Sequence, residues 1–294
     1  MIFMTDSVKE KIKSGELPQI TEENYYSDEI NKAYMSFHTW LSLHGSLGCP
    51  ACEAKAMAEL NGEYGSEEKS DAFLIGGYVD ACLTGTKGEF ERFKKEHPEM
   101  YSTRGESKGQ LKSTYKIADI MIDRCKKDKL FMAFIGGEHQ DIFCAELFGC
   151  VWKCKLDSYT PHKAIVDLKT TREMHKQFYV PDFGHIDFIS YYSYHHQLAI
   201  YRAIVKACMG EELPCFICPV SKSEHPEIKI VHVDDVTLFD AITEVKNSCE
   251  NTELLSVWRG ETEPLRCGRP DCDYCVDTEV LTAPINYKDL IAGD

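Results

Sequence analysis

The sequence predicts an α/β fold, and three stretches of the chain lead to this expectation. Residues 151–156 (VWKCKL) alternate apolar and polar side chains, as in a half-buried strand, and residues 164–168 form a short apolar run after a turn rich in Ser, Thr and Pro. These two strands are expected to form a hairpin. Residues 188–209 have the length of a long helix. Residues 214–220 and 228–233 predict a second hairpin, followed by an amphipathic helix at 236–258.

The elements that precede these strands are expected to be mostly helical. Residues 1–20 indicate a short polar helix and a linker, and Pro50 stands where a proline opens a helix at 52–60. Gly76 and Gly77 destabilise the next helix, which indicates close approach to its backbone. The predicted elements are helices at 37–43, 52–60, 71–83, 88–98 and 107–127, a short apolar element at 130–135 and a strand at 138–148.

The composition is that of an ordinary globular protein, with 43% hydrophobic and 28% charged residues. No stretch approaches the roughly 20 apolar residues of a membrane span, and the first residues lack the apolar core of a signal peptide. We therefore expect a cytoplasmic protein that does not cross a membrane. The 14 cysteines are scattered along the chain, which fits buried thiols in a reducing compartment better than a disulfide framework.

The net charge of −15 argues against a protein that coats nucleic acid nonspecifically, because phosphate contacts normally come from Lys and Arg. A phosphate-binding surface would have to concentrate its positive charge locally. The segment 104–129 is rich in Lys and Arg, and Lys108, Lys112 and Lys116 recur every four residues. On a helix they would form one stripe, which is either such a surface or a solvated helix face.

Two carboxylates and a lysine give the first chemical signal. Asp157 closes one predicted strand, and Asp167 interrupts the apolar run of the next, where a buried carboxylate needs a partner or a cation. Neighbouring carboxylates suit Mg²⁺ or Mn²⁺, which take oxygen ligands. Lys169 lies two residues beyond Asp167 and so points to the same face of the strand. There it could orient or help deprotonate a water that attacks a phosphodiester.

The long helix adds Gln197 and Tyr201, which are four residues apart and therefore share one face. We expect both side chains to point at the metal site or at a bound phosphate. The segment 170–187 is irregular, and its length suits a loop over a site. Its aromatic residues would either stack unpaired bases or pack the loop against the body.

Three cysteines near the C-terminus give a second chemical signal. Cys267, Cys272 and Cys275 lie in a loop rich in Gly, Pro and Asp. Thiolates at such short spacing converge on one soft cation, so the pattern predicts metal ligation with a fourth ligand from elsewhere. Four thiolates satisfy either a [4Fe–4S] cluster or a structural Zn²⁺. Free thiols are the remaining alternative.

Asp157, the triplet Asp167-Leu168-Lys169 and the helix motif of Gln197 and Tyr201 together resemble the signature of the PD-(D/E)xK nucleases, in particular their RecB-type branch. The sequence blocks are similar to phage and prophage proteins of the exodeoxyribonuclease VIII (RecE) type. These blocks lie at 23–36, 52–64, 73–85, 93–106 and 267–275. The resemblance covers most of residues 20–280 and implies a restriction-endonuclease-like core, in which helices flank a mixed central sheet.

The resemblance also implies further ligands. The Leu168 carbonyl would join the two aspartates at the divalent metal, and Asp80 would take the place where related nucleases commonly carry a His; a structural Asp80 is the alternative. In RecB-type relatives such as AddB and the CRISPR adaptation nucleases, an iron–sulfur cluster staples a distant N-terminal cysteine to a C-terminal trio. By this resemblance Cys52 is the fourth ligand of a [4Fe–4S] cluster, although the neighbouring Cys49 could serve instead.

These features imply one nuclease domain at 21–280, with a helical part at 21–130, a catalytic core at 131–258 and a cysteine clamp at 259–280, between a polar segment at 1–20 and a tail at 281–294. The implied activity is a Mg²⁺- or Mn²⁺-dependent exonuclease that acts on linear double-stranded DNA ends in phage-type recombination. The resemblance further implies a ring-like homo-oligomer and a RecT-type annealing partner. The alternatives are a CRISPR-adaptation or defence nuclease on this scaffold, and an inactive DNA-binding or assembly subunit.

Overall fold

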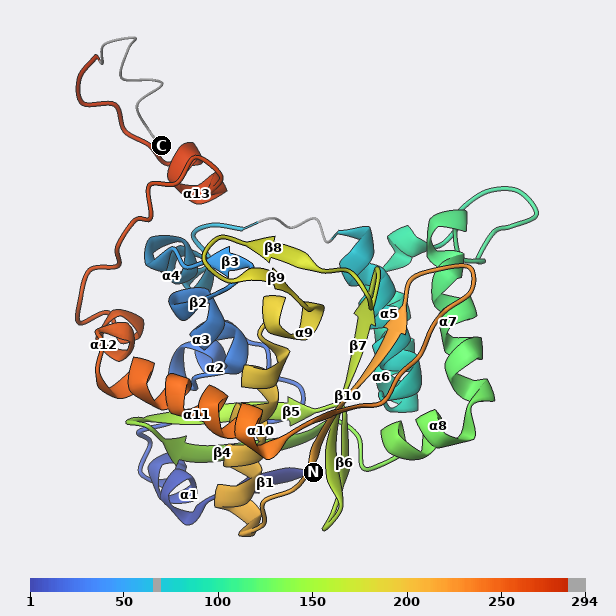
Figure 1. Cartoon of the computed structure of the whole chain (residues 1–294), viewed down its shortest axis with the longest axis horizontal. Helices are drawn as coiled ribbons and strands as arrows, with labels where there is room; N and C mark the ends of the chain where they lie inside the picture. The colour runs from blue at the N-terminus through green and yellow to red at the C-terminus, as the bar shows by residue number, and fades with distance from the viewer. Residues whose placement is uncertain (66–69, 285–294) are drawn as a thin grey trace.

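Two mixed β-sheets form the centre of the molecule, and helices cover both of their faces (Figure 1). This computed structural model describes residues 1–65 and 70–284, with the side chains of all but Cys49 and Lys87 among them. The arrangement confirms the predicted α/β class with mixed sheets flanked by helices. The strands of the two sheets are β1 (Ile2–Met4), β4 (Asp141–Leu147) and β5 (Cys150–Leu156) in the first, and β6 (Ser158–Thr160), β7 (Ala164–Thr171), β10 (Cys215–Ser221) and β11 (Val231–Val233) in the second.

The first sheet has the order β1-β4-β5, and its outer strand comes from the start of the chain. β1 runs parallel to β4, with Ile2 opposite Ile142, while β4 and β5 are antiparallel neighbours. Residues 1–20 do contain the predicted helix, α1 (Asp6–Lys13), but the strand before it was not predicted. Three residues carry no periodic signal of their own, and their partner strand lies far away in the sequence.

The second sheet has the order β11-β10-β7-β6, with β7 and β10 parallel and the two edge strands antiparallel. The predicted hairpin of β10 and β11 is confirmed. The first predicted hairpin is wrong in its pairing, because the antiparallel partner of β5 is β4 and the antiparallel partner of β7 is β6. Only Asp157 separates β5 from β6, so the chain changes from one sheet to the other at this residue.

Helices α5 (Asp71–Leu83), α6 (Lys87–Glu96), α7 (Lys116–Lys127) and α8 (Lys129–Ile135) stand on one side of β7 and β10 (Figure 1). Val166 and Leu168 of β7 pack into the apolar cluster that this layer forms. The predicted stripe of lysines is wrong, because α7 begins only at Lys116, and Lys108 and Lys112 precede it. A single 3-10 turn (Ser113–Tyr115) is the nearest regular structure before α7.

On the opposite face lie α3 (Phe37–His44), α4 (Glu53–Asn61), α10 (Tyr194–Met209), α11 (Asp235–Glu250) and α12 (Leu254–Trp258). Ile165 of β7 packs into the large apolar cluster of this side, so successive residues of β7 serve opposite layers. The helix predicted at 188–209 is interrupted, because Ser193 has a φ of 57°, and α9 (Phe188–Tyr191) precedes it. The helix predicted at 236–258 likewise divides into α11 and α12.

The connections between these layers contain short elements of their own. The predicted loop at 170–187 contains an antiparallel hairpin. Pro50 does not open a helix as predicted, since it lies in a short strand and α4 begins only at Glu53. Within the described ranges, no helix is both long and apolar enough to span a membrane. The remaining elements are α2 (Asp28–Ala33), β2 (Gly45–Ser46), β3 (Cys49–Pro50), β8 (Phe178–Val180), β9 (Gly184–Ile186), α13 (Asp273–Asp277) and a 3-10 turn at Pro98–Met100.

Candidate active site

Asp157 reaches from the junction of the two sheets to the edge of β7. β6 pairs with β7 only as far as Val166, opposite Ser158, so the backbone beyond that point lacks a strand partner on this side. The Asp157 carboxylate takes this place, where Oδ2 accepts a hydrogen bond from the Leu168 N–H at 2.8 Å. In a strand the N–H and C=O of one residue point to the same edge. The Leu168 carbonyl therefore lies on the Asp157 side of β7.

Asp167, Lys169, Gln197 and Tyr201 form one buried contact network between β7 and α10. The ammonium of Lys169 lies 2.7 Å from Asp167 Oδ2. Gln197 Nε2 donates to Asp167 Oδ1 at 3.1 Å and to the hydroxyl of Tyr201 at 2.8 Å. The spacing of i and i+2 on the strand, and of i and i+4 on the helix, thus brings all four side chains together.

Asp80 reaches the same site from α5, which packs closely against its neighbours. A Cβ atom at Gly77 would lie 2.7 Å from the ring of Phe93, and one at Gly76 would lie 3.0 Å from Thr170 Oγ1 of β7. The two glycines therefore permit the close approach that the sequence indicated. The Asp80 carboxylate accepts a hydrogen bond from Thr84, and its charge acts on Asp157.

Burial raises the pKa of Asp80, Asp157 and Asp167, and the negative charges of Asp80 and Asp167 raise that of Asp157 further. Burial opposes the charge of Lys169 too, but Asp167 and Asp157 outweigh it and raise the pKa of Lys169. Asp167 is buried and Asp80 and Asp157 are half-buried, so the three carboxyls repel one another in a site of limited hydration. A divalent cation would relieve this repulsion, since hard oxygen ligands suit Mg²⁺ and Mn²⁺. The carboxylate oxygens are the ligands that such an ion takes, although among the described residues they do not converge as tightly as the cysteine sulfurs of the second site.

The site opens into a cavity of about 970 Å³. More cations than carboxyl groups line this cavity, although the whole chain carries a net charge of −15. The charged residues that line it are Lys153, Lys155, Lys169, Arg172 and Lys222, and Glu59, Asp80, Asp157 and Asp167. The cavity therefore has a small excess of positive charge, which comes from strands and their connections and not from the predicted lysine stripe.

Several cavity residues were not singled out from the sequence. Lys153 and Lys155 are two residues apart and so project from one face of β5, and Asp157 follows at the same interval just beyond the strand. That spacing could have drawn attention to the two lysines. Lys153 Nζ donates a hydrogen bond to the Tyr25 carbonyl and lies 4.3 Å from the centroid of the Tyr25 ring. Lys155 Nζ lies 3.0 Å from Glu89 Oε1. The aromatic lining residues Tyr25, Tyr26, His38, Tyr192 and Tyr194 come from segments with no common sequence signal.

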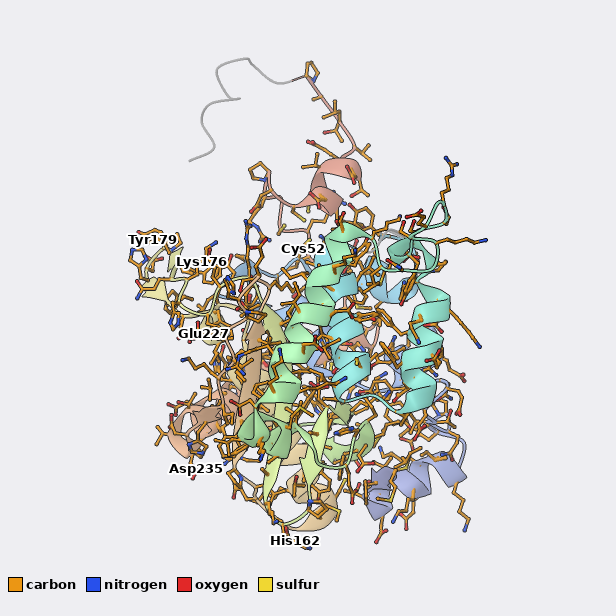
Figure 2. The ribbon with its side chains drawn as sticks, turned by 90° about the vertical axis from the view of Figure 1, so that its right-hand side faces the viewer. Cys52, His162, Lys176, Tyr179, Glu227 and Asp235 are labelled. Carbon is orange, nitrogen blue, oxygen red and sulfur yellow. The ribbon has the colours of Figure 1, made fainter. Side chains whose placement is uncertain are left out.

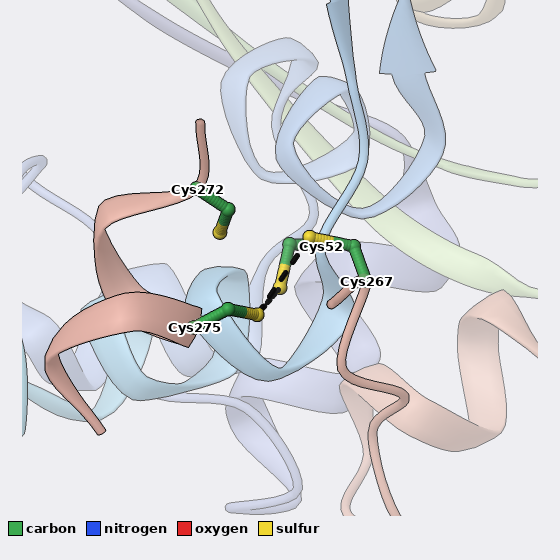
Figure 3. Close-up of side chains that lie close together, drawn as sticks. All are labelled: Cys52, Cys267, Cys272 and Cys275. Carbon is green, nitrogen blue, oxygen red and sulfur yellow. Dashed lines mark hydrogen bonds between the residues drawn. The ribbon is translucent and has the colours of Figure 1, made fainter. Parts of the chain in front are cut away.

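The four predicted cysteines meet at a second site, where α13 packs against the start of α4 (Figure 3). The sulfurs of Cys52, Cys267, Cys272 and Cys275 all lie within 4.8 Å of one another. Cys275 Sγ is 3.7 Å from the sulfurs of both Cys52 and Cys267. Among the described residues, these cysteines are the set of three or more His, Cys, Asp or Glu ligands that converges this tightly. The side chain of Cys49 lies outside the described residues.

The cysteine site is reinforced by contacts that join the C-terminal segment to α4. The Ala54 N–H donates to the Leu265 carbonyl at 3.0 Å, and the Tyr64 hydroxyl donates to Asp277 at 2.8 Å. Burial opposes ionisation of Cys275, but the Gly268 backbone and the neighbouring thiols lower its pKa to about 7. A thiolate is the form that ligates a metal. Four thiols in this arrangement can hold a metal.

Comparisons with known proteins place this chain in a family. A search of curated proteins finds no match. The crystal structure of a "Putative exonuclease" from Eubacterium rectale superposes with a TM-score of 0.85 at 41% identity, covering 94% of this chain and 99% of that one. Residues 35–278 match the model of a family described as "PDDEXK-like domain of unknown function (DUF3799)". The chain therefore belongs to this PDDEXK-like family, within the PD-(D/E)xK nuclease superfamily.

Proposed function

We propose that the protein is a deoxyribonuclease that uses Mg²⁺ or Mn²⁺ and degrades linear double-stranded DNA from its ends. The observation that carries this proposal is the convergence of Asp157, Asp167 and Lys169 with Gln197 and Tyr201 at one cavity. The family supplies the reaction class, a nuclease. The end specificity is supported by the 41% identity to the protein described as a "Putative exonuclease". Phage-type recombination, a ring-like homo-oligomer and a RecT-type partner rest on the sequence resemblance alone.

The side chains divide into metal ligands and groups that act on the substrate. Asp157, Asp167 and the Leu168 carbonyl would hold the divalent ion, with Asp80 as a further ligand from α5. Asp157 is already fixed by the Leu168 N–H, so little reorganisation is needed before it binds. When bound, the ion supplies a polarised phosphate and a more acidic water.

Lys169 would orient the attacking water and offset the negative charge that grows on the phosphoryl group. In the absence of a metal ion, burial opposes the charge of Lys169, but Asp167 and Asp157 outweigh it and raise its pKa. A protonated ammonium donates hydrogen bonds and cannot abstract a proton. This favours the orienting and electrostatic role over that of a general base.

Gln197 would fix the orientation of the Asp167 carboxylate. Its amide N–H groups reach both Asp167 Oδ1 and the Tyr201 hydroxyl, so Tyr201 holds the amide and the amide holds the carboxylate. Because Asp167 also lies beside Lys169, the two oxygens of this carboxylate have different partners. The network thus sets which lone pairs face the metal position.

The four cysteines would form a structural metal clamp that ties the C-terminal segment to α4. Around one tetrahedral Zn²⁺ with Zn–S bonds of about 2.3 Å, ligand sulfurs lie about 3.8 Å apart. The two separations of 3.7 Å from Cys275 fit that geometry, within a set of four sulfurs that all lie within 4.8 Å of one another. In a [4Fe–4S] cluster each cysteine binds a different iron, which spreads the sulfurs farther. We therefore place Zn²⁺ first and keep the [4Fe–4S] cluster as the alternative. Iron, sulfide and zinc analysis after anaerobic purification decides between them.

A substrate panel tests the proposed nuclease activity. Linear, nicked and closed circular duplexes of one sequence are incubated with the native protein and Mg²⁺ or Mn²⁺. End-dependent degradation predicts loss of the linear form while closed circles survive. Cleavage of closed circles would instead establish an endonuclease, as expected of a defence role. Binding without cleavage under every divalent ion would establish an inactive DNA-binding subunit.

A further inference from the structure

Aromatic rings form a continuous series from the Lys169 side chain to the hairpin of β8 and β9. The ring of Tyr194 has its centroid 4.7 Å from Lys169 Nζ, and Tyr192 stacks against Tyr194 with centroids 5.6 Å apart. Phe178 of β8 then contacts Tyr192 edge-on at 5.7 Å. Because Tyr192 and Tyr194 line the cavity, the series connects the cavity to the hairpin.

The base of this hairpin is anchored to the body of the protein. The ring of Phe178 stacks on that of Tyr191 in α9, with centroids 4.0 Å apart and planes inclined by 18°. Tyr191 in turn approaches Gly48 so closely that a Cβ there would lie 2.5 Å from its ring. Val180 at the end of β8 is buried. The body therefore fixes the position of the hairpin, and its tip is held in place without a ligand.

The outer side and the turn of the hairpin carry large aromatic rings in solvent. Tyr179 in the middle of β8 is 69% exposed and meets His185 of β9 edge-on with centroids 5.6 Å apart, and Phe183 in the turn is 63% exposed. Figure 2 shows Tyr179 at the outer edge of the molecule, and Lys176 Nζ lies 4.9 Å from the centroid of the Phe178 ring. Two large exposed aromatic residues on one fixed element mark an interaction surface more often than isolated ones do.

We propose that Tyr179, Phe183 and Tyr192 form a stacking surface for the unpaired bases of a DNA strand on its way to the cavity. The inference rests on the proposed function and adds its substrate class, ends with an unpaired segment. Every base has a π-face, so stacking on such rings is sequence-tolerant. A paired duplex shows these faces only at its ends. The exposed Arg172 and Lys176 lie along the same segment and suit the phosphates of the strand.

Continuity with the cavity favours a nucleic-acid strand over a protein as the occupant of this surface. Tyr192 belongs to both the aromatic series and the cavity lining, so a strand whose backbone reaches Asp157 and Lys169 would lead its next bases across Tyr192. The cavity lining is also the region where cations outnumber carboxyl groups. A protein partner would have no reason to extend into that site.

The test measures binding of fluorescein-labelled oligothymidylate and of a blunt duplex by anisotropy, with the full chain, low salt and no divalent ion. The double variant Tyr179→Ala, Phe183→Ala removes both exposed aromatic rings of the hairpin. Tyr179→Phe keeps a ring and is the rescue variant. Phe239→Ala removes an equally exposed ring, 66% exposed, from α11 and is the matched control. Thermal unfolding verifies that all the variants are folded.

Stacking predicts that the double variant binds the unpaired strand at least about fivefold more weakly, which corresponds to about 1 kcal/mol for one lost base contact. Its binding to the blunt duplex should change less, and both single variants should bind as the native protein does. Native-like binding of the unpaired strand by the double variant, or equal weakening for both ligands, would overturn the inference. DNA cleavage is measured separately, so its absence would sink the proposed function without deciding this one.

Discussion

At the scale of single residues, the site depends on how one carboxylate is held. Asp167 lies on the apolar face of a parallel strand and is 2% exposed, so its charge requires the partners that β7 and α10 provide. Gln197 is the partner that also contacts Tyr201, which makes Tyr201 a positioning residue that acts through the amide. Replacing Gln197 and replacing Tyr201 should therefore lower the rate of DNA degradation by different amounts.

We predict that Gln197→Ala lowers the rate of DNA degradation more than Tyr201→Phe does. The alanine leaves Asp167 without its amide donor, whereas the phenylalanine removes one hydrogen bond and lowers the free energy of unfolding by only about 1 kcal/mol. Initial rates and urea unfolding of both variants provide the measurement. A Tyr201→Phe protein that loses as much activity as Gln197→Ala would show that the hydroxyl touches the substrate directly.

At the scale of elements, Glu244 on α11 joins two helices through histidines. Its carboxylate oxygens lie 3.0 Å from Nε2 of His196 in α10 and of His44 in α3. The hydrogen bond from His196, and to a smaller extent that from His44, lowers the pKa of Glu244 below its usual 4.5, although burial opposes this. Because the folded pKa is lowered, the stabilisation is present above the usual value and is lost as the pH falls below it.

Glu244→Gln should therefore lower the free energy of unfolding near neutral pH, and the difference from the native protein should shrink at acid pH below 4.5. The side chain is 53% exposed, so solvent screening limits the effect to about 0.5–1 kcal/mol. Urea unfolding near neutral pH and below pH 4.5 measures the difference in the free energy of unfolding. Glu250→Gln, whose pairing with Lys246 is long at 3.9 Å, is the control. An equal difference at both pH values would contradict this account.

Some of the helices and strands could be predicted from the sequence, and others could not. β10 and β11 were predictable because a hairpin is local, and α5 was predictable from its apolar composition. β1 and β6 were not, because each has three residues and its place depends on a partner strand. The proposed site residues could be named despite the wrong hairpin, since spacings within β7 and within α10 do not depend on which strands pair. The spacing of Lys153 and Lys155 before Asp157 was visible in the sequence too, but the cavity that they line is known only from the structure.

At the scale of the whole molecule, the cysteine clamp connects parts of the chain that are distant in sequence. Cys52 precedes α4, while the other three cysteines follow the last helix of the core, so a bound metal closes most of the chain into a loop. Closing so long a loop removes freedom mainly from the unfolded chain. The clamp should therefore affect stability much more than the chemistry at Asp157 and Asp167.

We predict that Cys275→Ser loses the metal and lowers the free energy of unfolding by at least about 3 kcal/mol, the linkage expected when free metal exceeds its dissociation constant about 100-fold. Elemental analysis and thermal unfolding measure the two effects together. Cys82→Ser, a partly exposed thiol outside the cluster, is the matched control. Metal-free native protein, or a Cys275→Ser protein with native stability, would rule out the clamp.

The most direct test of the central claim is degradation of end-labelled linear duplex DNA with Mg²⁺ or Mn²⁺, comparing the native protein with Lys169→Ala. Losing the ammonium beside Asp167 removes a donor for the developing charge, so we predict a rate at least about 100-fold lower with the fold retained. Lys246→Ala, an exposed lysine on α11, should degrade DNA as the native protein does. Equal degradation by native protein and Lys169→Ala would contradict the account, because the DNA would then be cut without the site described.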